Sequence, residues 1–149
     1  MKEFKKILFP VDLSESSPKL APYVLTMAEK FGSEICLLFV GRVLEHFTSI
    51  YVPHPSIDRF ENEVIEGAKK RLQEFKEEYF QAFADTKAVV VAGDIAEEIL
   101  NYIKSEGIDL VIMGTHGRKG LEKVVFGSVA ERVAKGSAAP VLLLNPHKI

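Results

Sequence analysis

Short, continuous apolar runs alternate along this chain with longer stretches in which apolar residues recur every three or four positions. A continuous run is typical of a strand buried on both faces, and the three- or four-residue spacing is typical of a helix with one buried face. Five strands are predicted in this way, over residues 7–11, 34–40, 87–92, 108–113 and 140–144. A helical pattern follows each strand except the last.

The first predicted helix carries start and stop signals. Ser14 or Ser17 can act as its N-cap, because a serine oxygen accepts a hydrogen bond from a free N–H group of the first turn. Gly32 is expected to end the helix in the left-handed conformation. Pro22 lies inside the helix and removes one backbone hydrogen bond, so we expect a kink there.

The second predicted helix is the longest and runs from residue 57 to about residue 83. One apolar stripe follows it, consisting of Ile57, Phe60, Val64, Ala68, Leu72, Phe75 and Tyr79. A third helix is predicted to start after Asp94, which acts as its cap, and to end before Gly107, and a fourth ends at Gly136. Residues 41–56 show no clear period and are predicted to form a loop.

The alternation of strands and helices determines the predicted fold class. Parallel strands joined by helices form a sheet that is covered on both faces, with right-handed crossovers. The chain is therefore predicted to be one α/β domain over residues 1–149, a doubly wound five-stranded parallel sheet with helices on both faces. In such sheets, ligands bind beyond the carboxyl ends of the strands, where the strand order reverses.

A glycine-rich stretch over residues 113–129 lies between the fourth predicted strand and the last helix. Gly114, Gly117 and Gly127 let the backbone approach a ligand closely, and the helix start adds free N–H groups and a positive dipole end. These features favour a phosphate, but a tight turn would need the same glycines. Ser128 precedes Glu131 at capping-box spacing, so its hydroxyl could serve the helix, a role that does not exclude phosphate binding.

Three predicted strand ends are expected to meet at one edge of the sheet, namely Pro10-Val11-Asp12, Val40-Gly41 and Met113-Gly114. Asp12 is the chemically distinctive residue, because its carboxylate can accept hydrogen bonds from ribose hydroxyl groups and base N–H groups. The same carboxylate could instead close an Asx-turn ahead of the first helix. The residues alone leave both roles open.

The composition narrows the range of partners. The 149 residues carry a formal net charge of -2, which offers no basic excess for a nucleic-acid backbone. No apolar run approaches the roughly 18 residues of a membrane span, and residues 1–6 lack the apolar core of a signal peptide. We therefore expect a cytoplasmic protein that binds neither nucleic acid nor membranes.

Several common site motifs are missing from the sequence. It has no Gly-x4-Gly-Lys-[Ser/Thr] phosphate loop and no Gly-x-Gly-x-x-Gly after the first strand, which argues against a P-loop NTPase and an NAD site. The four histidines and Cys36 show no metal-ligand spacing, so no protein metal site is predicted. Cys36 lies in an apolar run, where a buried and inert thiol is expected.

The run Ile7-Leu-Phe-Pro-Val-Asp12, together with the spacing Gly114-x2-Gly117-x9-Gly127-Ser128, resembles the universal stress protein family, and in particular its ATP-binding branch. The resemblance extends over essentially the whole chain and implies a Rossmann-like fold similar to that of adenine nucleotide alpha hydrolases. It implies that Asp12 and backbone groups of Val11 and Val40 hold adenosine. The full candidate site consists of Pro10, Val11, Asp12, Val40, Met113, Gly114, Gly117, Gly127, Ser128 and Val129.

The resemblance also implies partners. It suggests a homodimer formed partly by the last strand, Val141 to Leu144, which would otherwise leave an unprotected sheet edge. Mg²⁺ is expected to bind through the phosphates of ATP, and a protein effector is expected but not identified. Three hypotheses follow: an ATP-binding regulatory domain with little or no hydrolysis, a slow ATPase switch, and an interaction module with an empty pocket.

Overall fold

The computed structural model describes residues 1–42, 55–116 and 127–149, with the backbone alone for residues 55–58. Its centre is a sheet in which all neighbouring strands run parallel. The strands are β1 (Lys6–Pro10), β2 (Glu34–Gly41), β3 (Lys87–Ala92), β4 (Leu110–Gly114) and β5 (Val141–Leu144). They lie in the order β3-β2-β1-β4-β5. The predicted five-stranded parallel sheet is confirmed.

The strand order reverses at β1. From β1 the chain moves outward through β2 to β3, then returns to β4 on the other side of β1 and continues to β5. The chain therefore leaves the carboxyl ends of β1 and β4 in opposite directions, and in doubly wound sheets this is the point at which ligands bind. The strands β3 and β5 form the two edges of the sheet.

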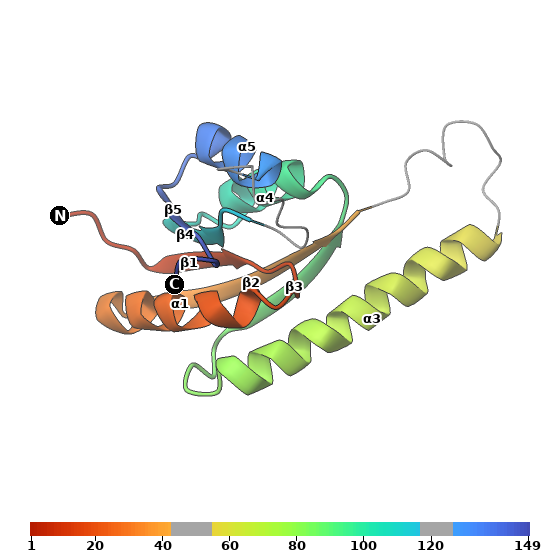
Figure 1. The fold of residues 1–149 in the computed structure, drawn as a ribbon, viewed down its shortest axis with the longest axis horizontal. Coiled ribbons are helices and arrows are strands. Elements are labelled where there is room, and N and C mark those ends of the chain that lie inside the picture. Colours follow the sequence, from red (N-terminus) through yellow and green to blue (C-terminus); the bar gives the residue numbers. More distant parts are fainter. Residues whose placement is uncertain (43–54, 117–126) are drawn as a thin grey trace.

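Two helices cover each face of the sheet (Figure 1). One face carries α1 (Ser17–Phe31) and α3 (Pro55–Tyr79), and the other carries α4 (Ile95–Ser105) and α5 (Ser128–Gly136). Successive strand residues point to opposite faces. Ile7 and Phe9 therefore pack on the side of α1 and α3, while Leu8 packs on the side of α4 and α5. The predicted helices on both faces are confirmed.

An aromatic cluster attaches α3 to the sheet. The ring of Phe9 is fully buried, and its centroid lies 6.2 Å from the centroids of both Phe75 and Phe80. Phe80 lies just beyond the end of α3. The chain turns there, and the N–H group of Phe83 donates a hydrogen bond to the carbonyl of Phe80. The helix thus ends at Tyr79, earlier than predicted, because the chain turns Phe80 into the core.

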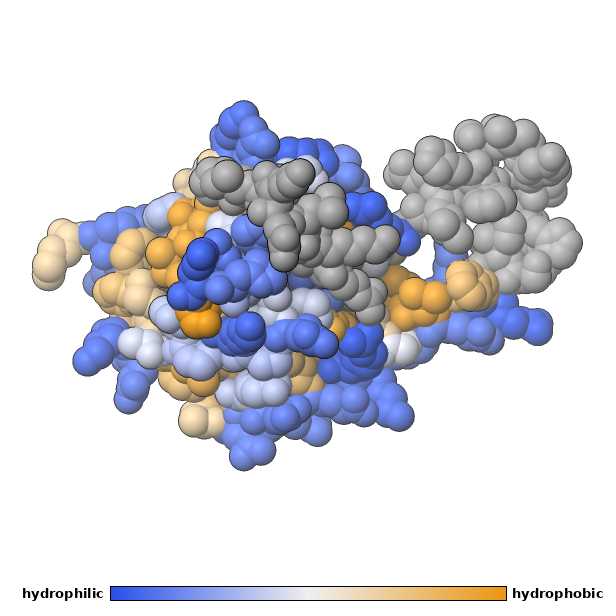
Figure 2. Space-filling model, in the orientation of Figure 1, coloured by the Kyte–Doolittle hydropathy of each residue, from blue (hydrophilic) through white to orange (hydrophobic). Residues whose placement is uncertain are grey.

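Only the second half of the apolar stripe on α3 is buried. Ala68, Leu72 and Phe75 are buried, whereas Phe60 and Val64 keep 56% and 49% of their surface exposed. Figure 1 shows that the first part of α3 extends beyond the sheet, and Figure 2 shows hydrophobic surface on this outer part. The prediction that one continuous stripe packs on the core was therefore wrong for the start of the helix.

The start of α1 also differs from the prediction. The cap position is occupied by Ser16, which makes no side-chain capping bond, rather than by Ser14 or Ser17. The hydroxyl groups of Ser14 and Ser17 donate to Asp12 instead. The helix continues through Pro22, and Gly32 ends it at a φ of 62°, as predicted.

Two further predictions concern the long connection and membranes. Residues 43–54, most of the loop predicted over residues 41–56, lie outside the described residues. Among the helices that the structure describes, none combines the length and the apolar character that are needed to cross a membrane.

Candidate functional site

The carboxyl ends of β1, β2 and β4 lie side by side at the end of the sheet where the strands terminate. Pro10 pairs with Leu38 of β2, and the N–H group of Val11 donates to the carbonyl of Leu38 at 2.8 Å. On the other side, Leu8 of β1 pairs with Val111 of β4. Continued along the strands, these registers bring Asp12 level with Val40, and Pro10 level with Met113. The three predicted strand ends are thus neighbours.

Three of the candidate residues can offer a ligand only their backbone. The side chains of Val11, Val40 and Met113 are 5%, 7% and 5% exposed. Val11 packs into the core under α1 and α3, while Val40 and Met113 pack into the core under α4 and α5. Their apolar side chains fix the strand ends in the core.

Asp12 closes a turn between β1 and α1 with one of its two oxygens. Its Oδ1 accepts hydrogen bonds from Ser14 N–H at 2.9 Å, Ser14 Oγ at 2.6 Å and Ser17 Oγ at 2.8 Å. The Asx-turn that the sequence left open is therefore present. All three of these bonds end on Oδ1, and no donor from the described residues is bonded to Oδ2. Among the described residues, the second oxygen therefore has no hydrogen-bond donor, while the first holds the turn.

Gly127 begins α5 in close contact with the end of β4. Its N–H group donates to the carbonyl oxygen of Thr115 at 2.6 Å, and Thr115 N–H donates to the carbonyl of Leu144 in β5 at 2.8 Å. A Cβ atom at position 127 would lie 2.9 Å from the Thr115 oxygen, closer than real Cβ atoms come. The backbone φ of −60° is open to any residue. Glycine is required here by the close approach of the backbone.

Ser128 does not form the predicted capping box. Gly127 occupies the cap position and α5 has no side-chain capping bond, so Ser128 is already the first helical residue. Its side chain is exposed, and Glu131 pairs with Lys135 Nζ at 2.7 Å. Since the cap is a glycine, the free N–H groups at the start of α5 have no side-chain partner in the helix. Free N–H groups at a helix start are the groups that bind anions in proteins.

The remaining glycine positions differ in what they contribute. A Cβ atom at Gly114 would lie 3.2 Å from Cδ1 of Leu20, so this glycine allows α1 to pack closely on β4. Gly117 lies outside the described residues. Val129 is half-buried and packs on the core under α4 and α5.

An ion pair that the sequence did not predict joins the cap of α4 to the middle of α5. Arg132 Nη1 lies 2.9 Å from Asp94 Oδ2. The pKa of Asp94 is lowered, first by the hydrogen bond from Glu97 N–H and then by the positive charge of Arg132. Asp94 was predicted as the cap of α4, and this is confirmed. The second partner of Asp94 is Arg132, which lies 38 positions away in the sequence, and no local sequence pattern connects the two residues.

A histidine pair lies beyond β4 and β5. Nδ1 of His116 is 2.8 Å from the Thr115 hydroxyl, and the rings of His116 and His147 meet edge to face with centroids 5.1 Å apart. The spacing of the four histidines in the sequence does not indicate this pair. The pair arises only because β4 and β5 are neighbours.

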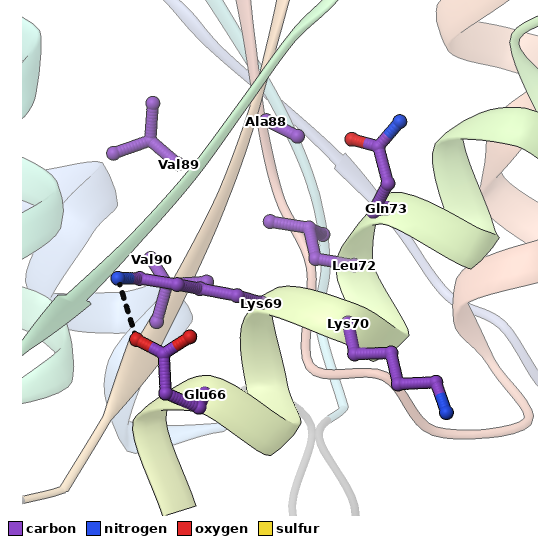
Figure 3. Close-up of a pocket in the computed structure, with 8 residues that line it drawn as sticks. All are labelled: Glu66, Lys69, Lys70, Leu72, Gln73, Ala88, Val89 and Val90. Carbon is purple, nitrogen blue, oxygen red and sulfur yellow. Dashed lines mark hydrogen bonds and ion pairs between the residues drawn. The ribbon is translucent and has the colours of Figure 1, made fainter. Parts of the chain in front are cut away.

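An open groove lies elsewhere, between α3 and the edge strand β3 (Figure 3). Leu72, Ala88 and Val90 form its apolar part, and the Lys69 ammonium is paired with Glu66 at 3.0 Å. The groove lies along the middle of β3 and not at the carboxyl ends of β1 and β4. It is therefore separate from the candidate site.

Comparison with known proteins identifies the relatives of this chain. A model of the universal stress protein family matches residues 3–145. Universal stress protein YxiE of Bacillus subtilis is 33% identical over 147 residues, which cover 95% of this chain and 99% of that protein.

Solved structures agree with this comparison. The structure of MJ0577, a universal stress protein of Methanocaldococcus jannaschii, has a TM-score of 0.82 and 31% identity and covers 97% of both chains. A universal stress protein family protein from Arabidopsis thaliana, solved with AMP bound, has a TM-score of 0.65 and 19% identity over 95% of this chain and 91% of that chain. At that identity the likeness shows the fold, which is the α/β fold described above.

Proposed function

This chain belongs to the universal stress protein family, and on that premise we propose that it is a regulatory domain that binds adenine nucleotides, with ATP as its ligand. The observation that carries the proposal is the start of α5, where the contact of Gly127 with Thr115 brings helical N–H groups next to the end of β4. A phosphate chain is the ligand that such a helix start favours.

The proposed ligand lies across the point where the strand order reverses. The free Oδ2 of Asp12 accepts hydrogen bonds from the adenosine, and backbone groups at Val11 and Val40 contact it. The phosphates bind the first N–H groups of α5 and the Ser128 hydroxyl. The AMP complex of the Arabidopsis relative supports an adenine nucleotide as the ligand class.

Mg²⁺ is proposed to bind through the phosphates. This ion keeps several water ligands and binds phosphate oxygens in preference to protein cages. In the chain as far as the structure describes it, no three His, Cys, Asp or Glu side chains are grouped as metal ligands. The role of the chain is therefore to orient the phosphates, whose oxygens hold the ion. Hydrolysis is not part of the proposal.

The test of the proposed function is a search for bound nucleotide. Purified protein is denatured and the released small molecules are identified, and protein stripped of ligand is titrated with ATP, ADP and AMP. Carried-over adenine nucleotide, or saturable binding in the titration, supports the proposal. Failure of both would contradict it and favour an interaction module. Formation of ADP in a single-turnover experiment would instead identify a slow ATPase switch.

Replacing Ser128 by alanine should weaken ATP binding by about three- to tenfold, the loss expected for one hydrogen bond. The thermal midpoint should not change, because the Ser128 hydroxyl makes no capping bond. Calorimetric titration measures the affinity, and adenosine serves as the control ligand, since it lacks phosphates and should bind both proteins equally. A lower thermal midpoint with unchanged ATP affinity would return Ser128 to a capping role.

The edge strand β5 supports a homodimer, which we include in the proposal. Pro140 and Leu144 accept hydrogen bonds from β4, so the backbone groups of Val141 and Leu143 point away from the sheet. An open edge of this kind pairs with a second strand unless it is protected. The cytoplasmic location and the lack of nucleic-acid and membrane partners stay predictions from the sequence.

Replacing Leu143 by proline should convert the dimer to a monomer. Proline removes the outward N–H group, whereas the bonds between β4 and β5 use the neighbouring residues. Sedimentation equilibrium should give about twice the chain mass for the wild type and one chain mass for the variant. A monomeric wild type, or a variant that remains dimeric, would contradict pairing through β5.

A further inference from the structure

A side chain of α3 reaches the turn that contains Asp12. Nη2 of Arg71 donates a hydrogen bond to the carbonyl oxygen of Leu13 at 2.9 Å, across 58 positions of the sequence. Leu13 directly follows Asp12. Neither residue belongs to a site motif in the sequence, and the proposed function does not use the bond between them.

Leu13 is held in an unusual backbone conformation. Its φ is 58°, and among the residues described it is the one non-glycine residue with a positive φ. A leucine is strained there because its Cβ atom comes too close to the following carbonyl oxygen. Strain of this kind persists only where surrounding contacts determine the conformation.

Three contacts hold this turn in place. Oδ1 of Asp12 binds Ser14 and Ser17, the Leu13 side chain packs against the core, and the Arg71 guanidinium binds the Leu13 carbonyl. The first acts within the turn and the start of α1, and the second holds the leucine side chain on the core. The bond from Arg71 is the polar contact that α3 makes with the Leu13 backbone among the described residues.

The part of α3 that carries Arg71 is anchored on the sheet, although Arg71 itself is exposed. The next residue, Leu72, is 1% exposed, and Ala68 and Phe75 on the same helix are also buried. Arg71 thus lies on the half of α3 that packs on the sheet, and not on the outer half with Phe60 exposed. Its guanidinium carries a permanent charge and a planar set of donors, so it can hold a carbonyl oxygen in a defined direction.

We propose that Arg71 is a positioning residue of the nucleotide site. It holds Leu13 in the left-handed conformation, and through the adjacent peptide it sets the direction in which the free oxygen of Asp12 points. This inference rests on the proposed function, in which Asp12 binds the adenosine. Because Arg71 acts through the turn and not on the phosphates, its effect is the same for every ligand that contains adenosine.

The test compares Arg71→Ala with Lys70→Ala in affinity for adenosine, AMP and ATP. Lys70 is the neighbouring residue and carries the same charge, so its variant controls for electrostatic attraction. We expect Arg71→Ala to weaken the binding of all three ligands by the same factor of about five to ten. This factor corresponds to the loss of one hydrogen bond from a charged group that affects the ligand only through the turn. A loss that grows from adenosine to ATP, or an equal loss in Lys70→Ala, would overturn the proposal.

A second measurement decides the role of Arg71 without a ligand. The amide of Ser14 is bonded to Asp12 Oδ1 at 2.9 Å. In ligand-free Arg71→Ala, this amide should exchange its hydrogen faster than in the wild type and in Lys70→Ala. Equal exchange in all three proteins would refute the positioning role. If the wild type binds no adenine nucleotide, the proposed function fails, and the exchange experiment still settles whether Arg71 holds the turn.

Discussion

Replacing Gly127 by valine should reduce ATP affinity by at least about 100-fold, which corresponds to about 2.8 kcal/mol of binding free energy. The new Cβ atom would lie 2.9 Å from the carbonyl oxygen of Thr115. That oxygen belongs to the backbone and cannot swing aside, so the start of α5 must move away from β4. The N–H groups that are proposed to hold the phosphates move with it.

The fold of this variant should survive. Ala130 and Val133 keep α5 attached to the core, and the backbone φ at position 127 is compatible with any residue. Circular dichroism checks the fold, and calorimetric titration measures the affinity. Gly67→Ala is the control, because a Cβ atom at Gly67 meets nothing within 4 Å. Wild-type affinity in Gly127→Val would mean that this glycine serves only the turn between β4 and α5.

Replacing Asp12 by asparagine should weaken the binding of adenosine, AMP and ATP by about 10- to 100-fold, the loss expected for a hydrogen bond to a charged group. Asparagine keeps one carbonyl oxygen, which can take over the bonds from Ser14 and Ser17 to Oδ1. It replaces the free Oδ2 by an NH2 group, which cannot accept hydrogen bonds from the adenosine. The variant therefore removes the proposed ligand contact and retains the turn.

Asp12→Ala provides the comparison. Alanine removes both oxygens, so the donors of Ser14 and Ser17 lose their acceptor and the thermal midpoint should fall. In Asp12→Asn the midpoint should stay close to that of the wild type. Thermal unfolding and calorimetric titration of both variants separate the two roles of this carboxylate. If Asp12→Asn binds adenosine as the wild type does, the carboxylate serves the Asx-turn alone.

The sequence predicted the sheet well because the signal for each element is local. Each strand is a continuous apolar run and each helix has a three- or four-residue period, so segments could be assigned without knowledge of their partners. The burial of α3 was less predictable. The apolar stripe looks the same on both halves of this helix, but only the half with Leu72 and Phe75 is buried, and Phe60 near the start keeps 56% of its surface exposed.

Helix starts were harder to predict where several polar residues compete for one role. Ser14 and Ser17 are both good cap residues in isolation, yet Asp12 Oδ1 binds both hydroxyl groups and the cap position falls to Ser16. Ser128 and Glu131 have the spacing of a capping box, yet Gly127 takes the cap position. In the first case the competing groups all lie within residues 12–17, whereas in the second Gly127 is held by its contact with Thr115 at the end of β4.

The sequence by itself determined the fold class, the alternation of elements and the edge of the sheet at which Asp12 and the start of α5 would be found, because period and strand direction are properties of short segments. The tertiary structure alone decided which atoms are free there. It brings Gly127 against Thr115 and joins Arg71 to Leu13 across 58 positions. Contacts between such distant positions leave no periodic pattern in the sequence, since they exist only once the helices have packed on the sheet.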